Sequence, residues 1–219
     1  MDVYTAALLA AHAGQSLDIQ GHAHQMDLAV AAADPRPLLE TLRLTHRLKS
    51  GAVEGACLRI AALAGGASPA VQHALNEYGT AVGCAYQISD DVCDLTGVPR
   101  AGQATKRVGE DLLNGKVTMP LAHAVGLLPR RRTRHLWDEV ARGTDAAGVR
   151  RIAEELRACG AVDACADEAL STLERAWRRL APLLPDTADD NEALHAIARH
   201  AIRRNLSPTE HTGPEPTGP

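Results

Sequence analysis

The sequence predicts an all-α protein. Apolar residues make up 45% of its 219 residues, yet aromatic residues make up only 2%, and phenylalanine is absent. A core without large rings must be built from Ala, Leu, Val and Ile, which suits closely packed helices better than a sheet. Apolar residues recur at helical spacing along most of the chain, and no segment shows the strict alternation of a strand. This length allows one sizeable core, so we expect a single helical domain over residues 1–206.

The first half of this domain is predicted to hold two long helical segments. Residues 3–32 have the pattern of one or two helices, broken near Gly14 and Gly21. A turn follows at residues 34–37, where two prolines disfavour helical conformation in the residues before them. The next helix is predicted over residues 38–64, because a Gly-Gly pair then gives a strong C-terminal signal.

The third helix, predicted over residues 69–96, carries the most information. Ser68 and Pro69 have the types that favour an N-cap and a first helical position, and Gly97 is expected to end the helix. A polar loop is predicted next, at about residues 97–110. Later helices are predicted over residues 117–128, 130–142, 145–159, 160–181 and 189–205, and residues 207–219, rich in Pro, Gly, Thr and Glu, are predicted to form a disordered tail.

Charge and hydropathy exclude several classes of function. The net charge of -4 gives no support to a nucleic-acid partner. No run of 18 apolar residues occurs, so we expect no membrane span. The amino terminus lacks the basic start of a secretory signal and carries Asp2, so we do not expect this segment to be one. These features together predict a cytoplasmic protein.

An acidic cluster lies near the end of the third predicted helix. At 100° per residue, Asp90, Asp91 and Asp94 fall within an arc of about 100°, and Gln87 falls in the same arc. Three carboxylates on one face repel one another, which is costly unless a cation compensates them. Mg²⁺ fits, because it prefers carboxylate oxygen and bridges to substrate phosphates. The alternative is a solvated acidic helix end.

The lysines support a diphosphate site. Of 23 basic residues only three are lysine, namely Lys49, Lys106 and Lys116, and the rest are arginine. Lysine is a compact point charge that serves phosphate oxygens well, so it does not exchange freely with arginine. Two of these lysines follow the acidic helix and one lies in the middle of the preceding helix. A surface lysine is the ordinary alternative for each one alone, but all three fall where a diphosphate would need them.

Five motifs together resemble those of trans-isoprenyl diphosphate (polyprenyl) synthases. They match in order and spacing, and the resemblance is close over residues 10–125. The motifs are GQxxD at residues 14–18, KSG at 49–51, GCAYQISDDVCD at 83–94, KxxGxD at 106–111 and GKxTxP at 115–120. The resemblance implies an antiparallel helix bundle that condenses an allylic diphosphate with isopentenyl diphosphate, with Mg²⁺ ions held on the allylic diphosphate by two facing Asp-rich motifs.

The resemblance also assigns roles to residues. Asp90 would be a direct metal ligand, with Asp91 and Asp94 as further ligands or as holders of metal-bound water. The proposed catalytic residues are Lys49, Gln87 and Lys106, and the substrate-binding residues are Gln15, Lys49, Ser50, Gln87, Lys106 and Lys116. Asp18 and Asp111 would act as partners of these side chains. Ser50 replaces the threonine usual in the family, so the hydroxyl is kept, and Tyr86 replaces the usual phenylalanine.

The chain departs from the family pattern at its start. GQxxD lies past the middle of family members but begins here at residue 14, so we expect an N-terminally truncated bundle. The first Asp-rich motif and the isopentenyl diphosphate pocket would be missing. Three hypotheses follow: a synthase that needs a partner chain, a cyclase-like enzyme that only ionises an allylic diphosphate, or a non-catalytic regulatory subunit of a complete synthase. A fragment is a fourth.

Association is expected under several of these hypotheses. Without the first helices, the helices over residues 38–64 and 69–96 should expose an apolar face, which should bind a partner. We therefore expect a homodimer, or a heteromer with a full-length synthase.

Overall fold

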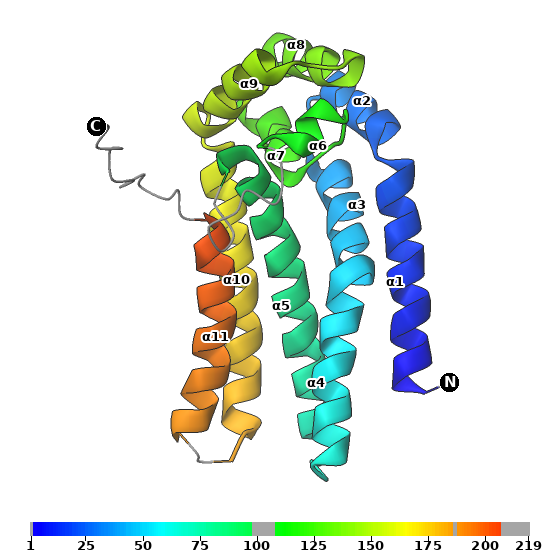
Figure 1. The fold of residues 1–219 in the computed structure, drawn as a ribbon, viewed down its shortest axis with the longest axis vertical. Coiled ribbons are helices and arrows are strands. Elements are labelled where there is room, and N and C mark those ends of the chain that lie inside the picture. The colour runs from blue at the N-terminus through cyan, green and yellow to red at the C-terminus, as the bar shows by residue number, and fades with distance from the viewer. Residues whose placement is uncertain (1, 98–107, 186–187, 207–219) are drawn as a thin grey trace, which may run out of the picture.

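The computed structural model describes residues 2–97, 108–185 and 188–206, and it confirms the all-α fold class. The described part consists of helices and their connections, without a strand. Helices α1, α4, α5 and α10 lie side by side, with successive long helices antiparallel, and α11 lies against α5 and α10 (Figure 1). The bounds are α1 Val3–Gln20, α2 Ala23–Ala32, α3 Arg36–His46, η1 Arg47–Gly51, α4 Ala52–Ala64, α5 Pro69–Thr96, α6 Glu110–Leu113, α7 Met119–Leu127, α8 Arg130–Arg142, α9 Ala146–Ala158, α10 Ala161–Leu180, η2 Ala181–Leu183 and α11 Ala188–Leu206.

Helix α5 is the centre of the fold, and its predicted ends are confirmed. The Ser68 side chain accepts a hydrogen bond from the Val71 N–H, and Gly97 ends the helix with φ of 72°. Both are the ordinary devices of helix termini. Helix α4 packs on one side of α5, and α10 and α11 pack on the other. At Gly83 an added Cβ would lie 2.8 Å from the Ser50 backbone, so glycine is what allows η1 and α5 to approach so closely.

The hydrophobic core lies along α5 and extends to the end of the molecule where α7, α8 and α9 pack. Small and branched residues fill it, as the composition predicts, and Tyr78 and Trp137 are its two large buried aromatic side chains among the described residues. Helix α7 is buried along most of its length, and α8 and α9 lie over it (Figure 1). This end of the bundle is therefore rigidly packed, and it holds the C-terminal end of α5 that carries the acidic cluster.

Predicted boundaries differ from the structure in the first half of the chain, where α3 already begins at Arg36, inside the predicted turn over residues 34–37. The first segment divides only at Gly21, where φ is 71°, and α1 continues through Gly14. The predicted helix over residues 38–64 is interrupted by a π-helical turn, η1, at Arg47–Gly51. A π turn inserts one extra residue without ending the helix, so no helix-stop signal marks it. Periodicity alone therefore could not reveal it.

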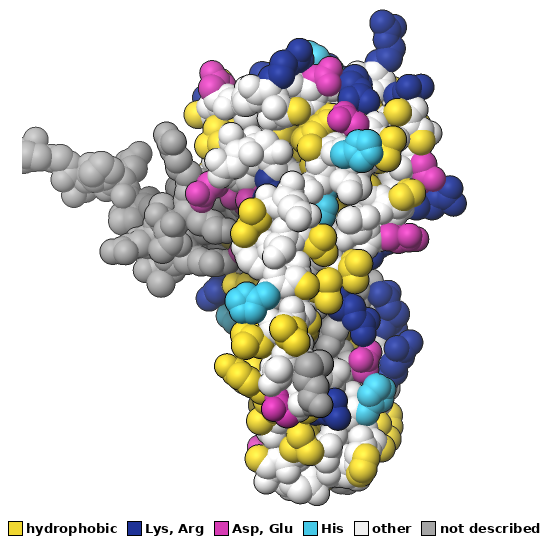
Figure 2. All heavy atoms as spheres, turned by 90° about the vertical axis from the view of Figure 1, so that its right-hand side faces the viewer, with side chains coloured by type: hydrophobic (Ala, Val, Ile, Leu, Met, Phe, Trp, Pro, Cys, Tyr) yellow, Lys and Arg dark blue, Asp and Glu magenta, His cyan; other side chains and the backbone are white. Residues whose placement is uncertain are grey.

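Several helices expose large apolar side chains, α1, α3 and α4 among them. On α1 they are Tyr4, Leu8, Leu9 and Ile19, and on α3 and α4 they are Leu44, Val53, Ile60 and Leu63. Figure 2 faces the side that carries α1, and hydrophobic side chains are visible along it. The expected exposed apolar face is thus present on α3 and α4. For α5 the expectation is wrong, because α4, α10 and α11 cover its large apolar side chains. Among the described helices, none is both long enough and apolar enough to cross a lipid bilayer.

Candidate functional site

Two of the three lysines meet at one aspartate. Lys49 donates a hydrogen bond from Nζ to Oδ2 of Asp18 at 2.7 Å, and Lys116 Nζ lies 3.3 Å from Asp18 Oδ1. Lys116 also lies 3.6 Å from Asp111 Oδ1. Burial alone would raise the pKa of Asp18, but the hydrogen bond from Lys49 and the charge of Lys116 outweigh it and lower that pKa. The cluster joins α1, η1, α6 and the segment before α7.

The π-helical turn presents the KSG motif. Within η1, Lys49 contacts Asp18 while the adjacent Ser50 donates its hydroxyl hydrogen to Oε1 of Gln87 at 2.8 Å. The five-residue π turn allows two consecutive side chains to reach partners on two different helices. Such turns occur frequently at functional sites. The structure thus places Lys49 beside Ser50 and bonds Ser50 to Gln87, and the roles given to these residues stay predictions.

The GQxxD motif places α1 against this turn. A Cβ added to Gly14 would lie 2.3 Å from the Lys49 backbone nitrogen, so only glycine fits at this contact. One turn later Asp18 is in position to bind the Lys49 side chain. Gln15 is exposed and does not join this cluster. Its proposed role in substrate binding stays a prediction.

The acidic motif divides into buried and half-buried carboxylates. Asp91 and Asp94 are 5% and 6% exposed. Oδ2 of Asp91 accepts a hydrogen bond from the Met119 N–H at 2.9 Å, and Oδ2 of Asp94 accepts one from the Asp111 N–H at 3.2 Å. Asp90 is half-buried. The two buried carboxylates therefore fix the segment over residues 111–119 against α5.

Burial governs the protonation of the groups around Asp91. It raises the pKa of Asp91 to about 7, against the opposing effects of the Met119 N–H and of Lys116. Oδ2 of Asp91 lies 3.9 Å from Nε2 of His46, whose pKa burial lowers to about 4. Nδ1 of His46 is buried without a hydrogen-bond partner. His46 was not singled out in the sequence, because a single histidine in an apolar pattern gives no signal.

The charges of the site fit a cation that also binds phosphate. Lys49 and Lys116 face Asp18, and Lys116 also faces Asp111 and acts on Asp91 of the motif, which lies at the C-terminal, partly negative end of α5. Among the described residues, no group of three His, Cys, Asp or Glu side chains is placed so that it could hold a metal ion by itself. Mg²⁺ commonly binds one or two carboxylates and completes its shell with water and substrate phosphate, so the half-buried Asp90 suits it. Lys106 lies outside the described residues.

These observations define an all-α bundle with a carboxylate and lysine site at the C-terminal end of its central helix. The chain belongs to the polyprenyl synthetase family, whose model matches residues 1–156. It is 32% identical over 158 residues to the geranylfarnesyl diphosphate synthase of Aeropyrum pernix, a match that covers 72% of this chain and 48% of that protein. It is 30% identical over 140 residues to the octaprenyl diphosphate synthase of Escherichia coli, with 64% and 42% covered.

Solved structures agree with this assignment. The polyprenyl synthase of Caulobacter crescentus, complexed with calcium and isoprenyl diphosphate, has a TM-score of 0.78 and 27% identity. That match covers 93% of this chain and 58% of the solved one. A decaprenyl diphosphate synthase from Rhodobacter capsulatus has a TM-score of 0.74 and 25% identity over 92% of this chain and 58% of its own. The chain spans about half the length of the curated relatives it matches.

Proposed function

We propose that this chain binds an allylic diphosphate together with Mg²⁺ at the C-terminal end of α5 and takes part in its condensation with isopentenyl diphosphate. Membership of the polyprenyl synthetase family implies prenyl chain elongation. The observation that carries the proposal is the convergence of Lys49 and Lys116 on Asp18, with Lys116 close enough to Asp91 of the acidic motif to oppose the rise of its pKa. The calcium and isoprenyl diphosphate in the Caulobacter structure support the proposed ligands.

The lysines would contact the diphosphate. Each ammonium is held by a carboxylate in a half-buried setting, so it is already oriented and partly freed from water. Asp90 would hold the metal, with Asp91 and Asp94 fixing the backbone around it. Bound Mg²⁺ would supply positive charge that stabilises the diphosphate as a leaving group. Charge-assisted hydrogen bonds from Lys49 and Lys116 would add to the same stabilisation.

The hydrogen-bonded pair of Ser50 and Gln87 would face the reacting carbon atoms. A serine hydroxyl and an amide oxygen carry partial negative charge but no proton that is easily lost. Such dipoles stabilise a developing allylic cation without reacting with it. The Ser50 hydroxyl points its hydrogen at Gln87, so the lone pairs of Ser50 are the ones left for a cation.

A partner chain is part of the proposal. Two relatives, from Geobacillus stearothermophilus and Bacillus subtilis, are each named as component 2 of a heptaprenyl diphosphate synthase. Exposed apolar side chains on α1, α3 and α4 favour association of this chain as well. We propose a homodimer or a heteromer with a full-length synthase. A single well-folded monomer in sedimentation at micromolar concentration would contradict it.

The decisive experiment measures products. The purified chain is incubated with Mg²⁺ and geranyl, farnesyl or geranylgeranyl diphosphate, with and without isopentenyl diphosphate, and diphosphate release and prenyl products are followed. Elongated prenyl diphosphates are the expected result, from the chain alone or after a synthase subunit is added. Hydrocarbon or alcohol products without isopentenyl diphosphate would instead establish cyclase-like ionisation. Binding of the allylic diphosphate without turnover under any condition would leave a regulatory subunit.

A further inference from the structure

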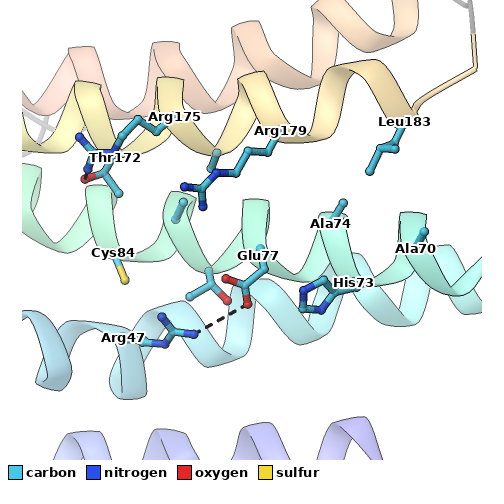
Figure 3. Close-up of a pocket in the computed structure, with 13 residues that line it drawn as sticks. Arg47, Ala70, His73, Ala74, Glu77, Cys84, Thr172, Arg175, Arg179 and Leu183 are labelled. Carbon is cyan, nitrogen blue, oxygen red and sulfur yellow. Dashed lines mark hydrogen bonds and ion pairs between the residues drawn. The ribbon is translucent and has the colours of Figure 1, made fainter.

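A groove between η1, α5 and α10 continues from the candidate site along the bundle. Its larger part is a cavity of about 570 Å³, and an adjoining cavity of about 440 Å³ reaches Ile88 and His46. The two share Arg47, Cys84 and Arg175 among their lining residues. Volumes of this size are typical of small-molecule sites. Figure 3 shows the larger cavity, with α10 on one side and α5 and η1 on the other.

The groove carries an excess of positive charge. Arg43 is paired with Glu168, and Arg47 lies 3.8 Å from Glu77. Arg175 and Arg179 have no carboxylate within ion-pair distance among the described residues, and both line the groove. Their side chains come from successive turns of α10, and Arg179 extends toward α5 (Figure 3). Within the described part of the chain, these two guanidinium groups on one wall thus have no compensating carboxylate.

Arg175 is also held in place. Its Nη1 donates to Ser171 Oγ and its Nη2 to Thr172 Oγ1, both at 3.1 Å. These bonds go to neutral hydroxyls, so they orient the guanidinium without neutralising its charge. An oriented arginine loses less side-chain freedom when it binds an anion. The wall is therefore prepared for a ligand with several acceptor oxygens.

Much of the remaining lining is small and apolar, beside the polar side chains of His73, Thr80 and Thr172. Ala70, Ala74, Ala81 and Ala176 lie along the cavity, and Leu183 closes one end. A bare hydrocarbon in this groove would cover two guanidinium groups without replacing their water, which is costly. A free phosphate would fill only a small part of the volume and leave the alanines exposed. A molecule with an anionic head and a short apolar tail would pair with the two arginines and also cover the alanines.

We propose that this groove binds a phosphate-bearing amphiphile through Arg175 and Arg179, at a subsite that needs no metal ion. Phosphate has more acceptor oxygens than carboxylate, so it can accept from two guanidinium groups at once. The apolar tail lies against the alanines of α5 and α10. Because arginine supplies the charge directly, binding does not depend on Asp90 or Mg²⁺. The inference goes beyond the proposed prenyl transfer and stands on different residues.

The test uses octyl phosphate as the probe, titrated into the intact chain in excess EDTA and followed by calorimetry. Binding is expected, with inorganic phosphate, octanol and octanoate at least about tenfold weaker. The double variant Arg175→Gln/Arg179→Gln should bind octyl phosphate at least about tenfold more weakly. Arg178→Gln is the matched control, because Arg178 is exposed on the same turn of α10 and does not line the groove.

Each other result overturns the inference in a defined way. Equal binding of inorganic phosphate would mean a free-phosphate site, and equal binding of octanol would mean a purely apolar one. Equal binding of octanoate would remove the preference for phosphate. Loss of binding in EDTA or in Asp90→Ala would place the probe at the metal site instead. Circular dichroism of each variant verifies that α10 stays folded, and the double variant should keep Mg²⁺-dependent binding of an allylic diphosphate.

Discussion

Asp18 Oδ2 lies 2.7 Å from Lys49 Nζ, and this contact joins α1 to the π-helical turn η1. The same carboxylate lies 3.3 Å from Nζ of Lys116. Two ammonium groups that repel each other are therefore held together by one aspartate. A diphosphate has more negative charge than a carboxylate, so we propose that it takes over both contacts when it binds and that Asp18 holds the lysines in place without it.

Asp18→Asn should destabilise the protein at neutral pH. The variant leaves the two half-buried lysines without the charge that holds them together, and we expect a loss of about 1–2 kcal/mol in the free energy of unfolding. Urea denaturation at pH 7 measures it. Asp163→Asn, on the exposed start of α10, is the control and should change stability by less than about 0.5 kcal/mol. Equal effects of the two substitutions would contradict the role given to Asp18.

Gly14→Ala should separate α1 from η1. The added Cβ would lie 2.3 Å from the Lys49 backbone nitrogen, and neither backbone can yield without moving a helix. We expect a loss of more than about 2 kcal/mol in stability, together with loss of Mg²⁺-dependent binding of an allylic diphosphate. Gly65→Ala is the matched control, because its Cβ would meet its nearest neighbour at an ordinary 3.4 Å. A variant as stable as the control would show that this close approach is not needed.

The sequence predicted most of the fold because its helices are long, periodic and marked at their ends. Helices α5, α8, α9 and α10 lie within one residue of the predicted bounds, where Ser, Pro or Gly marks an end. The π turn η1 and the four-residue helix α6 were missed. A π turn does not end the helix and so carries no stop signal, and four residues are too few to show a period. The local sequence pattern therefore predicts where a helix lies, but it does not predict where a π turn changes the direction of the side chains that follow.

The candidate site was predictable where a residue type is rare. Lys49 and Lys116 stood out because lysine is scarce in this chain, and they meet at Asp18. The groove arginines could not be found in the same way, because the chain contains 20 arginines and none of them is distinctive in sequence. Only the packing of α10 against α5 separates Arg175 and Arg179 from the others.

Asp90→Ala should abolish Mg²⁺-dependent retention of an allylic diphosphate. Asp90 is half-buried at the acidic end of α5, and the change removes the carboxylate proposed to hold the metal. Retention of geranyl diphosphate on the protein, with Mg²⁺ and with EDTA, measures the effect. Asp163→Ala should bind as the unchanged protein does. Similar retention by both variants would identify the acidic motif as a solvated helix end.

Glu168 joins three helices, and its replacement should produce a pH-dependent loss of stability. Its carboxylate accepts hydrogen bonds from Arg43 at 2.6 and 2.8 Å and lies 3.1 Å from Nε2 of His123, so it connects α10 to α3 and α7. Burial alone would raise the pKa of Glu168, but the hydrogen bonds from Arg43 and His123 outweigh it and lower that pKa to about 2.

A carboxyl group whose pKa is lower in the folded state stabilises the fold above its unfolded pKa, near 4.5, and this contribution disappears as the pH falls toward 2. Glu168→Gln should therefore cost about 2 kcal/mol at pH 7, with allowance for the partial exposure of Arg43. The difference from the unchanged protein should shrink below pH 4.5 and vanish near pH 2. Urea denaturation at a series of pH values measures this difference.

Asp167→Asn is the control, because Asp167 is an exposed neighbour of Glu168 without an ion pair to the described residues, and this variant should show no such pH dependence. If Glu168→Gln costs the same at pH 3 as at pH 7, the carboxylate charge is not what joins these helices, and shape alone accounts for the contact.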